Sequence, residues 1–203
     1  MQGGRSIEVQ LAPELLRIFF PLFQEGVEME VKAGCSIREL LIEQFGISAE
    51  YISTRITTVF VNHRAVDNMD SAQIYDGAVL ALSGAMPGLV GATMRSGGFY
   101  AAMRGNMTYR NEATAPEVKS GRIKLKLFNL LLPELGPRLL QRGIVLSVAR
   151  WQEFLSQQPE QLRVRGYWLD GRALPVDQLR AGTNLPAATE VVKLKVYSGD
   201  EIA

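Results

Sequence analysis

The sequence predicts an α+β protein with two similar domains, each built from a mixed β-sheet and one main helix. A strand–strand–helix–hairpin–strand pattern occurs twice along the 203 residues. The strands of both copies alternate apolar and polar residues, as half-buried strands do. We expect a first domain over residues 1–84, a glycine-rich segment and linker over 85–121, and a second, divergent domain over 122–203. Roughly 80 residues suffice for a modest core in each domain.

Each copy begins with an alternating strand, at residues 7–11 in the first and 123–127 in the second. A Leu/Pro-rich stretch follows, and a glycine then precedes a second short strand. Each copy closes with another strand, at residues 78–82 and 191–196, which is followed by Ser-Gly.

The helix signals are clearest in the first copy. Ser36 and Glu39 have the spacing of a capping box, in which each side chain bonds the other residue's backbone N–H. The apolar residues that follow at helical spacing predict a helix from Ile37 to Phe45. In the second copy Trp151 and Phe154 begin an equivalent stripe, without a capping box.

Two dipeptides predict tight hairpins at matching places. Asp170-Gly171 is typical of a type I′ turn, whose two central residues need positive φ. Asn62-His63 occupies the same position in the first copy. A lone His in such a turn is expected to be an ordinary surface residue.

This element order resembles the β-grasp, or ubiquitin-like, arrangement. The sequences at 36–41, 61–66 and 76–82 look like those of the small sulfur-carrier proteins of molybdopterin and thiamin synthesis. In that family an adenylating enzyme activates a C-terminal Gly-Gly, which then becomes a thiocarboxylate. The resemblance implies a protein partner, with an adenylating enzyme as one candidate. The printed sequence ends Gly-Asp-Glu-Ile-Ala, so we do not expect the intact chain to act as a carrier.

The glycine-rich segment offers two hypotheses about a site. Arg95-Ser96-Gly97-Gly98 resembles a ubiquitin-like tail, and cleavage after Gly98 would release the first domain as a carrier or modifier. Alternatively, the segment binds a partner or an anion through Arg95, Tyr100 and Arg104, since arginines beside backbone N–H groups hold phosphates and carboxylates. Its methionines and aromatics suit a protein interface, so self-association is a further alternative. Residues 111–121 read as a polar linker.

Composition argues against several function classes. Lys+Arg 22 against Asp+Glu 21 gives a net charge of +1, which does not favour a nucleic-acid partner. One His and one Cys do not make a His/Cys metal site, and no cofactor motif is present. Cys35 precedes a helix start, where a lowered pKa would make it reactive; the alternative is a small buried residue.

Membrane insertion is not expected. Residues 77–94 carry no charge, but their glycines and proline favour a strand followed by a loop over a spanning helix. The polar N-terminus does not look like a signal peptide, and the single cysteine fits the cytoplasm.

The sequence therefore favours a non-catalytic protein-binding or adaptor protein without metal or cofactor. The alternative is a precursor of a sulfur carrier or ubiquitin-like modifier, released by cleavage after Gly98.

Overall fold

A computed structural model describes residues 5–84, 86–110, 118–158, 164–182 and 184–199. The chain divides into two compact units. Unit 1 combines Met1–Pro21 with Leu135–Ala203, and unit 2 is Leu22–Glu134. Each unit holds a sheet with both parallel and antiparallel strands, together with helices, so the α+β class is confirmed.

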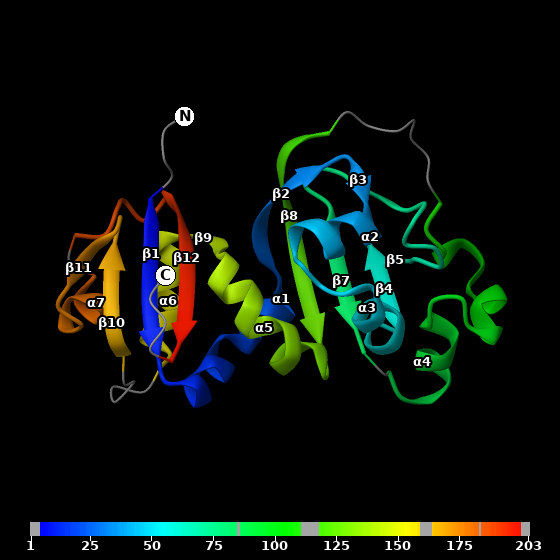
Figure 1. Cartoon of the computed structure of the whole chain (residues 1–203), viewed down its shortest axis with the longest axis horizontal. Coiled ribbons are helices and arrows are strands. Elements are labelled where there is room, and N and C mark those ends of the chain that lie inside the picture. Colours follow the sequence, from blue (N-terminus) through cyan, green and yellow to red (C-terminus); the bar gives the residue numbers. More distant parts are fainter. Residues whose placement is uncertain (1–4, 85, 111–117, 159–163, 183, 200–203) are drawn as a thin grey trace. The chain divides into compact units, whose positions relative to one another are not determined.

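The sheet of unit 2 has five strands (Figure 1). In spatial order they are β2 (Val27–Ala33), β8 (Lys119–Phe128), β7 (Val79–Ser83), β4 (Thr58–Val61) and β5 (Arg64–Ala65). The central strands β8 and β7 run parallel, and their outer neighbours β2 and β4 are antiparallel to them.

Unit 1 has a sheet with a similar plan. Its strands in spatial order are β9 (Ile144–Ser147), β12 (Val191–Ser198), β1 (Ser6–Leu11), β10 (Val164–Leu169) and β11 (Arg172–Leu174). Again the two central strands, β12 and β1, are parallel and the flanking strands antiparallel.

The first strand of each sequence half lies in the unit formed mainly by the other half. Strand β1 pairs with β10 and β12, and Figure 1 shows it (blue) between them (orange and red). Strand β8 pairs with β2 and β7. The compact units therefore do not follow the contiguous ranges 1–84 and 122–203 given above. The sequence near β1 and β8 does not indicate this exchange of opening strands between the two units. Both strands alternate apolar and polar residues, so either one could be a central strand of either sheet.

The prediction of one main helix per domain was wrong. The described residues contain α1 to α7 and three further helical segments. The Leu/Pro-rich stretches after the opening strands form η1 (Pro13–Phe19), α1 (Phe20–Glu25) and α5 (Leu131–Arg142). These stretches connect one unit to the other. A tight hairpin turn would instead place the next strand beside the first strand. Their buried side chains include Phe19, Phe23, Leu139 and Leu140.

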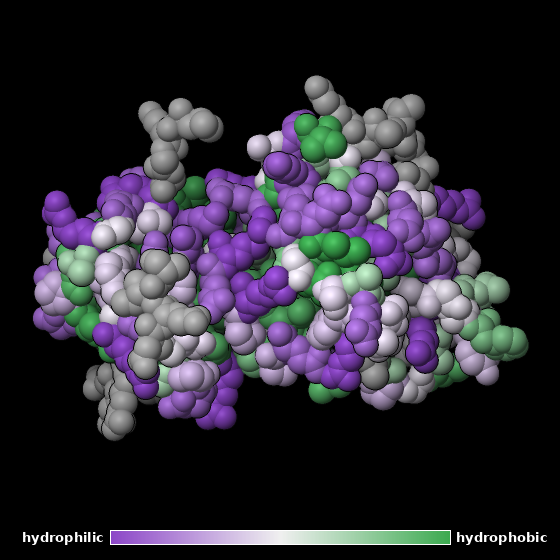
Figure 2. Space-filling model, in the orientation of Figure 1, coloured by the Kyte–Doolittle hydropathy of each residue, from purple (hydrophilic) through white to green (hydrophobic). Residues whose placement is uncertain are grey.

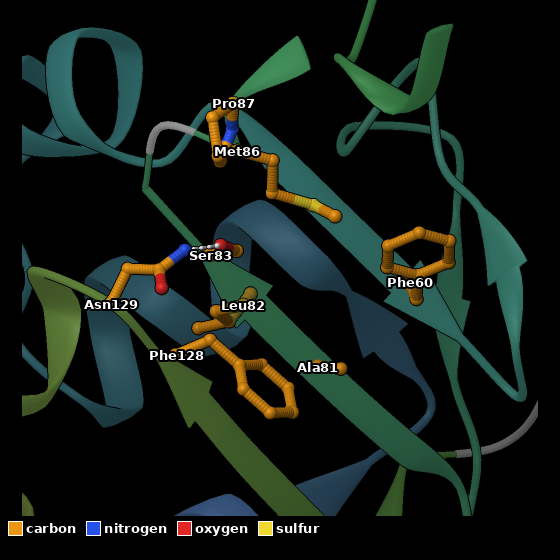
Figure 3. A pocket seen from close by; sticks show the side chains of 8 residues that line it. All are labelled: Phe60, Ala81, Leu82, Ser83, Met86, Pro87, Phe128 and Asn129. Carbon is orange, nitrogen blue, oxygen red and sulfur yellow. Dashed lines mark hydrogen bonds between the residues drawn. The ribbon is translucent and has the colours of Figure 1, made fainter. Parts of the chain in front are cut away.

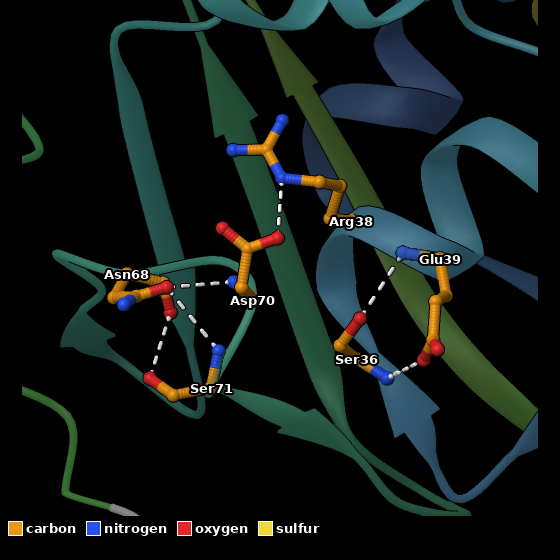
Figure 4. A network of polar contacts seen from close by, with 6 residues as sticks. All are labelled: Ser36, Arg38, Glu39, Asn68, Asp70 and Ser71. Carbon is orange, nitrogen blue, oxygen red and sulfur yellow. Dashed lines mark hydrogen bonds and ion pairs between the residues drawn. The ribbon is translucent and has the colours of Figure 1, made fainter.

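The predicted capping box is confirmed. Ser36 Oγ accepts from Glu39 N at 3.2 Å, and Glu39 Oε2 accepts from Ser36 N at 2.8 Å (Figure 4). They open α2 (Ile37–Glu39), which continues into the π-helical η2 (Leu40–Gln44). Arg38 Nε, on the same turn, bonds Asp70 Oδ1 at 2.6 Å and so ties the helix to the 68–71 loop. In unit 1, Ser147 caps α6 (Val148–Ser156) by accepting from Arg150 N.

Short elements complete the units. They are α3 (Ala49–Arg55), α7 (Asp177–Ala181) and the two-stranded sheet of β3 (Cys35–Ser36) and β6 (Gln73–Ile74). Both predicted I′ turns are confirmed, since φ is positive at Asn62, His63, Asp170 and Gly171. In the part of the chain that is described, no helix combines the length and apolar character of a membrane span.

The two faces of the unit 2 sheet differ. One face is buried and includes Met29, Leu80 and Leu125. The other, here called the outer face, carries Phe60, Ala81, Lys126 and Phe128. Phe60 pairs with Ala81 and Ala81 with Lys126, so these three point to the same side. The candidate site lies on this face.

Candidate functional site

The glycine-rich segment after β7 is folded. It forms α4 (Gly88–Met94) and η3 (Phe99–Met107), which we call together the α4–η3 segment. Helix α4 packs closely against Met86, because a Cβ added at Gly91 would clash with the Met86 carbonyl oxygen. Only glycine fits at this position. Residues 111–117, expected as a linker, lie outside the described residues.

Backbone and hydroxyl groups fasten the α4–η3 segment and its flanks to Thr57, the residue before β4, to β5 and to the loop after β5. Ser96 N donates to Thr57 O at 2.9 Å, and Ser96 Oγ donates to Val66 O at 2.6 Å. At the far end, Tyr109 N donates to Ala65 O at 2.8 Å. These bonds explain why a stretch so rich in glycine keeps a defined path.

A buried ion pair completes this attachment. The Arg104 side chain is fully buried, and its Nη2 lies 2.5 Å from Asp67 Oδ1 and 3.3 Å from Arg95 O. Asp67 Oδ1 also accepts from Gly97 N at 2.9 Å. Arg104 Nε and Nη1 are buried and have no hydrogen-bond partner among the described residues. The guanidinium that the sequence offered for anion binding is therefore engaged with a carboxylate of the same chain.

Gly97 and Gly98, the suggested processed tail, lie in the turn between α4 and η3. Gly97 has φ of +61° and donates to Asp67, while Gly98 N donates to Arg95 O at 3.1 Å. A protease binds its substrate in an extended conformation, so this turn would have to open first. Cleavage after Gly98 stays a prediction.

Arg95 and Tyr100, the other two suggested binding residues, are exposed. The Tyr100 ring packs edge-on against Phe99, with 5.2 Å between centroids. The structure brings the Arg95 backbone to Arg104, while the Arg95 side chain remains on the surface. Anion binding by these residues stays a prediction.

Large apolar side chains are exposed on the α4–η3 segment. Phe99 is 93% exposed, and Leu89 and Met103 are each 71% exposed. With Val90, Tyr100 and Met107 they make what we call the α4–η3 apolar surface. Figure 2 shows pale and green surface at the right-hand end of the view, where Figure 1 draws η3. A monomeric protein seldom gathers so many apolar groups at one exposed place without a binding role.

A hollow of about 370 Å³ adjoins this surface. Its lining consists of Phe60, Ala81, Leu82, Ser83, Met86, Pro87, Phe128 and Asn129. Figure 3 shows the Met86 side chain pointing toward Phe60, so the residues just before α4 form one wall and the outer face of the sheet forms the floor. Ser83 Oγ accepts from Asn129 Nδ2 at 3.0 Å at one side of the hollow.

Sequence reasoning missed the hollow and the Asp67 partner of Arg104. One signal was available for the hollow, since alternation places Phe60 and Phe128 on the face where polar residues are expected. Asp67 gave no comparable signal, because 37 residues separate it from Arg104.

The Cys35 thiol is not activated by the helix start. Burial raises its pKa above the ordinary value, and the nearby Glu39 carboxylate raises it further. His63 is exposed in its turn. Among the described residues, no group of three or more His, Cys, Asp or Glu side chains is placed to hold a metal ion.

Comparison of the chain with protein-family models, with curated proteins and with solved structures finds no match.

Proposed function

We propose that this chain is a non-catalytic protein-binding or adaptor protein, built on two β-grasp units similar to the sulfur carriers. The observation that carries the proposal is the α4–η3 apolar surface. Phe99, Met103 and their neighbours expose large apolar groups on a segment that many hydrogen bonds hold in place. A fixed apolar surface loses little conformational entropy on binding, which favours docking of another protein.

The strand arrangement supports the β-grasp part of the proposal. In unit 2 a capped helix follows β2, a I′ hairpin joins β4 to β5, and the last strand β7 lies parallel to a neighbour in the sheet. Strand β8 supplies that neighbour from the other half of the chain. The family resemblance makes an adenylating enzyme one candidate partner, and we place the protein in the cytoplasm.

The composition of the hollow supports binding over catalysis. Its polar side chains are Ser83 and Asn129, and they hydrogen-bond to each other. Neither is an acid or base near neutral pH, whereas an apolar lining suits an apolar group of a partner.

Quantitative affinity capture from the native host tests the proposal. The double variant Phe99→Asp with Met103→Asp should lose a partner that the wild-type chain retains. Val176→Asp, at an exposed apolar residue of unit 1, is the matched control and should retain that partner. Equal partner sets for all three proteins would refute docking at this surface.

The alternative, a precursor cleaved after Gly98, has its own test. Intact mass spectrometry of the protein from its native host would reveal a fragment that ends at Gly98. The anchored turn at Gly97 leads us to expect the uncleaved mass instead. A Gly98-terminated fragment carrying a thiocarboxylate would establish the precursor function.

A further inference from the structure

The hollow beside Met86 has the size of a site for one bulky side chain. Its volume of about 370 Å³ lies near the lower limit of small-ligand pockets, roughly 300–1,000 Å³. Phe60, Phe128 and Met86 offer apolar contacts on its sides. An aromatic or large aliphatic group fits this lining.

The hollow and the α4–η3 apolar surface are continuous along the chain. Met86 and Pro87 line the hollow, and α4 begins at the next residue and exposes Leu89 and Val90. A partner segment lying along α4 can therefore place one side chain in the hollow and others on the exposed apolar groups.

The edge strand of the unit 2 sheet is not free to pair with an added strand of a partner. Strand β5 is the edge strand, and Ala65 pairs with Thr108 in a parallel bridge and accepts from Tyr109 N. The two residues that follow η3 thus occupy backbone groups that an added strand would need. Docking through side chains, as an amphipathic helix docks in a groove, remains open to a partner.

The charged residues of the chain between β7 and Glu112 are all basic. The sequence holds no acidic residue between Asp76 and Glu112, while Arg95, Arg104 and Arg110 lie in that interval. Arg104 is buried on Asp67, but Arg95 and Arg110 are exposed and form no ion pair within the described part of the chain. Positive charge beside an apolar surface favours a partner with acidic residues.

We infer that the partner is an acidic amphipathic helix, which seats one bulky apolar side chain in the hollow and sets acidic residues against Arg95. This inference rests on the proposed function. A second copy of the chain is a poorer occupant, because a two-fold contact uses the same patch on both copies and brings arginine toward arginine.

Two labelled helical peptides of about 15 residues test the inference. They share a Leu/Phe face and differ only in Glu or Lys on the polar face. Fluorescence anisotropy with the full chain should show saturable binding of the Glu peptide and at least about tenfold weaker binding of the Lys peptide. Equal binding of both peptides, or no binding of the Glu peptide, overturns the inference.

Variants assign the binding to the hollow and to Arg95. Ala81→Phe fills the hollow and should weaken binding of the Glu peptide about tenfold. Ala173→Phe, at an exposed alanine of β11, should leave that binding unchanged. Arg95→Glu should reduce the preference for the Glu peptide about threefold, and Arg172→Glu should leave it unchanged. If Ala81→Phe binds the Glu peptide as tightly as the wild-type chain does, the peptide binds outside the hollow and the inference is overturned.

Other occupants give distinct results that overturn the inference. A concentration-dependent dimer in sedimentation that Ala81→Phe dissociates would show self-association. Binding of a small aromatic probe that Ala81→Phe abolishes, without peptide binding, would mark a small-molecule site.

Loss of the partner with the Phe99/Met103 double variant but not with Ala81→Phe overturns the inference and leaves the proposed function standing. Partner retention by the double variant refutes the proposed function, whatever the hollow binds.

Discussion

Arg104 and Asp67 fasten the α4–η3 segment to the loop after β5. The fully buried guanidinium lies 2.5 Å from the Asp67 carboxylate, which also accepts from Gly97 N. A buried arginine stabilises a fold only while its charge is matched. Together with the bonds of Ser96 and Tyr109, this pair holds the segment and its exposed side chains in place.

Asp67→Asn should destabilise the chain by about 2–3 kcal/mol, because it leaves the Arg104 charge buried without a carboxylate. The loss falls short of the roughly 3–5 kcal/mol of a fully buried pair because the Asp67 side chain is 36% exposed. Urea unfolding followed by circular dichroism measures the change. Asp70→Asn, which breaks the exposed pair with Arg38, is the control and should cost under about 1 kcal/mol.

Arg104→Met should cost less than Asp67→Asn. The substitution removes the buried charge together with the two unpaired donors Nε and Nη1, each of which carries a desolvation penalty. The same unfolding experiment compares the two variants. A larger loss for Arg104→Met would mean that the guanidinium makes contacts beyond Asp67 and Arg95 O.

Neither half of the chain should fold alone. A fragment of residues 1–110 lacks β8, so β2 and β7 lose the strand between them, and residues 118–203 lack β1. Mixed together, the two fragments should restore the native circular dichroism and co-elute on size exclusion. If the 1–110 fragment is monomeric and unfolds cooperatively, β1 can pair with β2 and β7 in place of β8. That result would contradict the assignment of β1 to unit 1 and of β8 to unit 2.

Cys35 should react slowly with iodoacetamide near pH 7. Burial and Glu39 raise its pKa and keep the thiol protonated, and only the thiolate attacks. The rate, measured by mass spectrometry, should go on rising to a higher pH than the rate of the same cysteine in the urea-unfolded chain. A plateau at or below neutral pH would show a thiol activated by the helix start.

Local signals in the sequence predicted the local structure well. The Ser36/Glu39 capping box and the Asn62-His63 and Asp170-Gly171 turns are where the sequence places them, because each depends on neighbouring residues alone. The exchange of β1 and β8 could not be predicted, since either strand satisfies the pattern of a central strand. The Leu/Pro-rich stretches were given no secondary structure, although they form helices, and Pro137 lies inside one of them.

The candidate site was predicted only in outline. The mixture of glycine, apolar residues and arginine set residues 84–110 apart from the polar stretch 111–121, and α4 and η3 form within that range. The burial of Arg104 depends on Asp67, and the hollow depends on Phe60, Met86 and Phe128, which three distant parts of the chain bring together. Such contacts between distant residues leave no periodic signal in a single sequence.

Photo-crosslinking in the native host tests docking at the α4–η3 apolar surface most directly. A benzophenone amino acid replaces Phe99 in one protein and Val176, exposed on unit 1, in another. We expect one defined crosslinked partner from position 99 and none from position 176. No adduct at position 99, or the same adducts from both positions, would contradict the proposal that this surface binds a partner.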